Sequence, residues 1–113
     1  MIVAVTYEND MVFQHFGRTQ KFELYTIENG EITGSEVVDT NGVGHHDLAP
    51  WLQARGVEAV VCGGIGTGMI QALQACGIAI FAGASGLTED AVNEYLRGGL
   101  ETVTGSNYEK HEC

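Results

Sequence analysis

The stretch VEAVVCGGIGTGMIQALQACGIAIFA, residues 57–82, contains two apolar segments on either side of a helical pattern. Residues 57–62 and 78–82 are short and apolar, which is typical of strands buried on both faces of a sheet. Between them, apolar residues recur on one helix face, at Met69, Ile70, Leu73 and Cys76. Because a strand–helix–strand connection crosses over with a right hand, its two strands run parallel. Residues 57–82 therefore predict an α/β domain.

Three further strands are predicted upstream of this stretch. Residues 2–6, IVAVT, form a continuous apolar run that is typical of a central strand. Residues 22–28 and 31–38 flank the pair Asn29-Gly30. This pair is the strongest short signal for a β-hairpin, because a type I′ turn needs a positive φ at both positions.

The helices and strands together predict one architecture. Besides the helix within residues 57–82, helical patterns begin near Asp47 and Thr88, which are placed to cap them, and end at Gly56 and Gly98. We expect an α/β fold with about three helices flanking a five-stranded mixed sheet. Its order is 3-2-1-4-5, with the strands numbered along the chain, so that the first strand lies in the middle.

The composition limits the class of protein. A chain of 113 residues corresponds to one domain. We expect residues 1–100 to fold and residues 101–113 to form a polar, partly mobile tail. The 15 acidic and 5 basic residues give a net charge of −10, which argues against binding to nucleic acid or to an anionic membrane.

The sequence also predicts the cellular compartment. No apolar run is long enough to span a membrane, and the first residues lack the pattern of a secretion signal. The odd number of cysteines argues against a disulfide framework. These cysteines are Cys62, Cys76 and Cys113. We therefore expect a cytoplasmic protein.

Four loops are predicted to meet at one edge of the sheet. They follow the carboxyl ends of strands that point the same way, and they comprise residues 7–21, 39–46, 63–67 and 83–87. The strands 2–6 and 57–62 are neighbours whose connections diverge. Ligands of open α/β sheets prefer such a switch point, so we expect the functional site at this edge.

Histidines are the candidate metal ligands at this edge. His15, His45 and His46 lie in its loops, and imidazole suits iron, zinc, copper and nickel. Arg18 is near His15, and Cys62 ends the strand that leads to the edge as a further candidate ligand. The alternatives are a solvated loop for the histidines and a small buried hydrophobic role for Cys62.

The glycine-rich segment GGIGTG, residues 63–68, is the second candidate feature of the edge. Its backbone N–H groups at a helix start suit an anion. It lacks the lysine of a Walker A motif and the third glycine of the dinucleotide fingerprint. It is therefore either a ligand loop or a tight turn. Near the C-terminus, His111 and Cys113 offer either soft ligands or a solvated chain end.

Four short motifs occur in a characteristic order: HFG at 15–17, GHH at 44–46, GGIG at 63–66 and LxxxGI at 73–78. With these motifs the sequence resembles the dinitrogenase iron–molybdenum cofactor biosynthesis family, the NifX-like domain that also occurs at the C-terminus of NifB proteins. The resemblance covers about residues 1–100. It implies a ribonuclease H-like motif, with a five-stranded mixed sheet and flanking helices.

The resemblance also implies a function. Members of the family bind an iron–sulfur or iron–molybdenum-type cluster, or its precursor, as carriers rather than as enzymes. The implied partner is a cofactor-assembly or acceptor protein. The positions that match the family are His15, Gly17, His45, His46, Gly63, Gly64 and Gly66.

Two other classes of function place different demands on the sequence. A two-metal nuclease needs carboxylates on the central strand, and residues 2–6 carry none. A non-catalytic regulatory or interaction module needs no metal and would dock a basic partner on the acidic surface. The sequence argues against the first class and leaves the second open.

Overall fold

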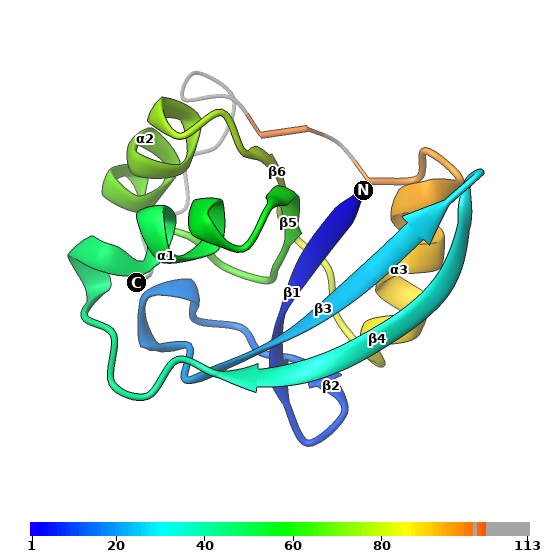
Figure 1. Ribbon diagram of the computed structural model, residues 1–113, viewed down its shortest axis with the longest axis horizontal. Helices are drawn as coiled ribbons and strands as arrows, with labels where there is room; N and C mark the ends of the chain where they lie inside the picture. The colour runs from blue at the N-terminus through cyan, green and yellow to red at the C-terminus, as the bar shows by residue number, and fades with distance from the viewer. Residues whose placement is uncertain (101, 104–113) are drawn as a thin grey trace.

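The computed structural model describes residues 1–100, 102 and 103, and its elements are labelled in Figure 1. The sheet is mixed. β1 (Ile2–Glu8) lies at its centre, between the antiparallel β3 (Lys21–Glu28) and the parallel β5 (Val57–Val61). β4 (Glu31–Asp39) and β6 (Ala79–Phe81) are the ends of the path β4-β3-β1-β5-β6.

The sheet has six strands, so the expected count of five was wrong. The additional strand, β2 (Met11–Val12), folds back on the end of β1 and pairs Val12 with Tyr7. The turn residues Asn9 and Asp10 have φ angles of 51° and 68°, the left-handed values that a type I′ hairpin turn requires. Sequence reasoning missed this hairpin because Asn-Asp is a weaker turn signal than the Asn-Gly pair that joins β3 to β4.

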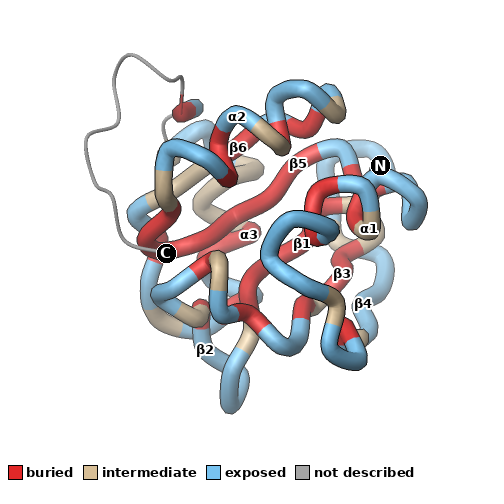
Figure 2. Tube along the Cα trace, turned by 90° about the vertical axis from the view of Figure 1, so that its left-hand side faces the viewer, coloured by how far each residue is buried: buried red, intermediate tan, exposed pale blue. Residues whose placement is uncertain are grey.

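Helices cover both faces of the sheet (Figure 1). α1 (Leu48–Ala54) and α2 (Thr67–Ala75) pack against one face, and α3 (Thr88–Leu96) packs against the other. β1 and β5 are therefore buried between two helical layers, as Figure 2 shows. The predictions of a mixed α/β fold and of three flanking helices are confirmed.

The helix starts differ from the predicted caps. Asp47 occupies the cap position of α1 but makes no side-chain capping bond. The cap position of α3 belongs to Leu87, not to Thr88. The Thr88 hydroxyl instead donates to Glu23 Oε1 at 2.6 Å and lies 2.9 Å from the Tyr25 hydroxyl. Thr88 thus joins α3 to β3, because it is buried at the contact between the helix and the sheet.

The segment predicted as a tail is described only at residues 102 and 103. Thr102 forms an isolated antiparallel bridge with Phe81. Val103 is buried, and its N–H donates to the Ile80 carbonyl at 2.7 Å. The chain therefore packs against β6 beyond residue 100. His111 and Cys113 lie outside the described residues. Within the described part of the chain, no helix is long and apolar enough to cross a membrane.

Candidate functional site

Two loops at the carboxyl edge of the sheet are joined backbone to backbone. His15 forms an isolated parallel bridge with Gly64. The Phe16 N–H donates to the Gly64 carbonyl at 3.1 Å, and the Gly64 N–H donates to the Gln14 carbonyl at 2.8 Å. We call these paired residues, 14–16 and 63–64, the loop seam. His15 is exposed on the seam. Two of the four loops that were expected at this edge, residues 7–21 and 63–67, are therefore in contact.

The residues after His15 anchor the seam to the core. Phe16 begins the 3-10 turn η1 (Phe16–Arg18), is fully buried, and packs its ring 5.6 Å from that of Phe22. The Thr19 hydroxyl donates to the His15 carbonyl at 3.3 Å. Because its neighbours are fixed in this way, the backbone of His15 is held while its side chain faces solvent. Gly17 is half-buried, and Arg18 is exposed at the end of η1.

Gln14 is a residue of the seam that sequence reasoning missed. Its side-chain amide donates to the Ala84 carbonyl at 3.1 Å and to the Val12 carbonyl at 3.2 Å. It thereby connects the His15 loop to the loop that follows β6. A Cβ on Gly63 would lie 2.5 Å from Gln14 Cδ, closer than real Cβ contacts come. The absence of a side chain at Gly63 therefore lets the Gln14 amide occupy this position. This contact joins residues far apart in the sequence, so no local motif predicts it.

The glycine loop leads directly into α2. Gly66 is the cap residue of this helix and has no side chain with which to cap the N–H groups of the first turn. The first turn of an α-helix leaves backbone N–H groups without partners inside the helix, and the helix dipole adds a partial positive charge there. The structure therefore supports the tight-turn interpretation at Gly63, and the ligand-loop interpretation of Gly64 and Gly66 stays a prediction.

His45 and His46 lie in a separate loop, at the 3-10 turn η2 (His45–Asp47) that leads into α1. Both are exposed, and their rings meet edge to face with centroids 5.4 Å apart. One backbone hydrogen bond joins the start of this loop to the end of the loop that carries His15: the Thr40 N–H donates to the Gln20 carbonyl at 2.8 Å.

The described residues do not gather the candidates into a site for a single ion. No group of three or more His, Cys, Asp or Glu side chains within residues 1–100, 102 and 103 could hold one metal ion. His15, His45 and His46 therefore do not converge as ligands of one ion. Contact of each with a larger cluster stays a prediction.

Cys62 is a core residue and not an accessible ligand. Its side chain is fully buried, and burial raises the pKa of its thiol to about 12. A metal must reach the sulfur and binds it as the thiolate, so burial that closes off the sulfur and disfavours the thiolate makes Cys62 a poor ligand. The structure therefore supports the hydrophobic interpretation of Cys62. Cys76 is half-buried at the C-terminal end of α2.

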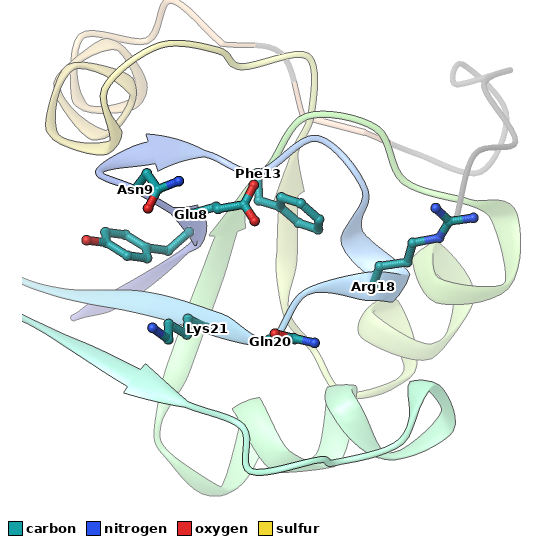
Figure 3. Close-up of a pocket in the computed structure, with 7 residues that line it drawn as sticks. Glu8, Asn9, Phe13, Arg18, Gln20 and Lys21 are labelled. Atoms are coloured by element: carbon teal, nitrogen blue, oxygen red, sulfur yellow. The ribbon is translucent and has the colours of Figure 1, made fainter.

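Shallow pockets surround the loop that carries His15. One of about 390 Å³, shown in Figure 3, lies beside the end of β1 and the start of β3 and includes Arg18. A second, of about 340 Å³, includes His15 and shares Glu8, Asn9 and Phe13 with the first. A third, of about 250 Å³, includes Arg18, Gly17 and residues of the 39–43 loop. The surface around His15 and Arg18 is therefore hollowed by open, shallow pockets.

Comparison with known proteins identifies relatives of similar size. The crystal structure of PH0822 superposes with a TM-score of 0.83 at 30% identity and covers 90% of this chain and 94% of its own. The apo form of the orange protein from Desulfovibrio gigas superposes with a TM-score of 0.81 at 29% identity, covering 95% of this chain and 96% of its own.

The uncharacterized protein MJ0580 of Methanocaldococcus jannaschii is 29% identical over an alignment of 107 residues, and the match covers 89% of this chain and 90% of that protein. The family model described as "Dinitrogenase iron-molybdenum cofactor" matches residues 1–98. Since this match spans the whole sheet and all three helices, the chain belongs to the dinitrogenase iron–molybdenum cofactor family.

Proposed function

We propose that this protein is a carrier that binds an iron–sulfur or iron–molybdenum-type cluster, or a precursor of one, without catalysing a reaction. The cluster is its cargo, and a cofactor-assembly or acceptor protein receives it. Membership of the family supports the class of cargo. The observation that carries the proposal is the loop seam, where an exposed histidine on a fixed backbone lies beside the glycine loop.

The chemistry of the seam suits such a cargo. Imidazole is a ligand for iron, and a neutral His15 would bind it through a ring nitrogen. The start of α2, at Gly66, favours the negative charge of a sulfide cluster. His45 and His46 would add ligands from the neighbouring loop. A cluster carries bridging sulfides of its own, so it needs fewer protein ligands at each metal than a bare ion does.

The openness of the edge suits release as well as binding. His15, His45 and His46 are all exposed, so an acceptor protein reaches them without unfolding the carrier.

The proposal includes a ribonuclease H-like fold without nuclease activity. On β1 the single carboxylate, Glu8, lies at the exposed end of the strand rather than inside the sheet, whereas two-metal catalysis needs several clustered carboxylates.

Anaerobic reconstitution with iron and sulfide tests the proposal. Visible absorbance and bound iron are measured after removal of free ions. We expect the wild-type chain to take up cluster and His15→Ala to bind it at least about tenfold more weakly, with a smaller loss in His45→Ala. Gln71→Ala, on the exposed face of α2, is the control and should match wild type. Equal uptake by all four proteins would contradict the site, whereas uptake by none of them would contradict the carrier function and favour the metal-independent interaction module.

A further inference from the structure

Two exposed hydrophobic side chains lie side by side near the carboxyl edge of the sheet, and the proposed cluster site does not use them. Among the described residues, four large hydrophobic residues are exposed, and Met11 and Leu87 are two of them, at 44% and 49%. An isolated antiparallel bridge joins the two residues, so β2 lies beside the start of α3 (Figure 1). Single exposed hydrophobic residues are normal on a protein surface, whereas adjacent ones indicate an interaction site. We call Met11 and Leu87 the apolar pair.

Backbone hydrogen bonds on both sides of the apolar pair fix its geometry. The Val12 N–H donates to the Gly86 carbonyl at 2.8 Å, and the Thr88 N–H donates to the Asp10 carbonyl at 3.1 Å. These bonds make the pair a non-hydrogen-bonded pair of the antiparallel type, whose Cα atoms lie about 4.5 Å apart and whose side chains lie on the same face. The two side chains therefore form one continuous apolar surface on a fixed backbone.

A hollow leads from the apolar pair to the proposed cluster site. The pocket of about 340 Å³ is lined by residues 8, 9 and 11–15, so it extends from Met11 to His15. His15 lies on the loop seam, beside the glycine loop. A protein seated on the apolar pair would therefore lie next to the histidine that is proposed to hold the cluster.

Exposed carboxylates accompany the apolar pair. The two segments that carry it, residues 7–15 and 83–91, contain four exposed carboxylates and no lysine or arginine: Glu8, Asp10, Glu89 and Asp90. Glu8 directly faces Met11 across the β1–β2 hairpin. None of the four takes part in the one ion pair found between described residues. An apolar centre with a charged rim is the usual anatomy of a protein–protein interface.

We propose that the apolar pair and its four carboxylates form the docking surface for the acceptor protein, and that the acceptor presents apolar side chains within a rim of lysine and arginine. The acceptor's role rests on the proposed carrier function. A second copy of this chain would bring like-charged carboxylates together, and an anionic membrane is repelled in the same way. A small docking surface suits the transient complex that handover of a cluster needs.

A peptide of defined composition tests the chemistry of this surface. The probe is a short synthetic peptide with two leucines at its centre and two lysines on each side, and it is titrated into the metal-free, ¹⁵N-labelled chain by NMR. One analogue has serines in place of the leucines, and the other has glutamates in place of the lysines. We expect amide shifts centred on residues 8–12 and 86–90, a Kd on the order of 1 mM that rises with salt, and at least about threefold weaker binding of both analogues.

Variants test the two parts of the surface separately. Met11→Thr and Leu87→Ser should each weaken peptide binding at least about threefold. Both should fold, because threonine suits a strand and serine suits a helix cap. Val37→Thr removes a hydrophobic side chain that is equally exposed, at 45%, on β4 and is the matched control. Glu89→Gln should weaken binding at low salt, whereas Glu36→Gln, which removes the same charge from β4, should weaken it less.

Cluster uptake separates this proposal from the carrier function. Met11→Thr and Leu87→Ser should take up cluster as wild type does, because neither residue is a proposed ligand. A wild-type chain that binds the peptide but takes up no cluster would support the docking surface and overturn only the carrier function. The docking surface is overturned if the peptide causes no localised shifts, if either analogue binds equally well, or if Val37→Thr weakens binding as much as Met11→Thr. Sedimentation of the free chain is the last check, since a dimer that Met11→Thr dissociates would assign the apolar pair to a second copy instead.

Discussion

At the scale of single residues, the environment of a side chain decides its chemistry more than its type does. Cys62 and His15 are both candidate soft or borderline ligands at the same edge of the sheet. Cys62 ends inside the core, with its thiol pKa raised by burial, whereas His15 is exposed on the loop seam. A small buried hydrophobic role was one of the two interpretations that the sequence allowed for Cys62, so this part of the outcome could be predicted from the sequence.

The buried thiol predicts a specific loss of stability at alkaline pH. The ordinary pKa of 9.0 is raised to about 12 in the folded protein. Between these values the unfolded chain releases the Cys62 proton and the folded chain keeps it. The free energy of unfolding should therefore fall as pH rises above 9, by at most about 1.4 kcal/mol per pH unit from this group.

Urea denaturation of wild type and Cys62→Ala from pH 8 to pH 11 measures this contribution. The alanine variant has a cavity cost at every pH, so only the pH dependence of the difference is informative. We expect the stability of wild type to approach or drop below that of the variant as the pH rises. Tyr25, whose pKa burial also raises, titrates in both proteins and cancels. A difference that stays constant over the range would contradict the assignment.

At the scale of elements, the loop seam connects three loops through one side chain. The Gln14 amide donates to the Ala84 carbonyl in the loop after β6 and to the Val12 carbonyl of β2, and it occupies the space where a Cβ on Gly63 would lie. The two residues therefore form a matched pair, and their substitutions should not be additive.

Gly63→Ala should destabilise the protein by about 1 kcal/mol, because its methyl group displaces the Gln14 amide from its two hydrogen bonds. Gln14→Ala should cost about 1 kcal/mol through its lost hydrogen bonds. In the double variant the collision is absent, so its stability should lie near that of Gln14→Ala alone. Chemical denaturation of the three variants measures the coupling. Simple addition of the two losses would show that Gly63 is needed for another reason.

At the scale of the whole molecule, the parts of the fold that sequence reasoning predicted are those with local causes. Apolar runs and helical stripes predicted the longer strands and the three helices, and Asn29-Gly30 predicted the β3–β4 turn, whose φ angles are 54° and 77°. The parts it missed depend on contacts between distant residues. Thr88 bonds to Glu23 instead of capping its helix, and Gln14 packs on Gly63. The ligand roles of the histidines stay a prediction.

The charge of the whole molecule also has a structural consequence. With a net charge of −10 and a single ion pair between described residues, most carboxylates experience like charges. One repulsion is local, because Glu28 and Glu31 are directly paired across the β3–β4 hairpin. Like charges in facing positions destabilise a sheet, and salt weakens such repulsion because the screening length falls from about 30 Å at 0.01 M to about 10 Å at 0.1 M.

We therefore expect the Tm to rise when sodium chloride is increased from 0.01 M to 0.1 M, and Glu31→Lys to raise stability by about 0.5 kcal/mol at low salt. Glu36→Lys changes the net charge equally but faces Leu24, so it is the matched control. Both variants should reduce the salt dependence, since both lower the net negative charge. Only Glu31→Lys should gain the additional cross-strand attraction. Thermal unfolding at both salt concentrations separates these effects, and an equal gain in the two variants would show that the total charge alone sets the repulsion.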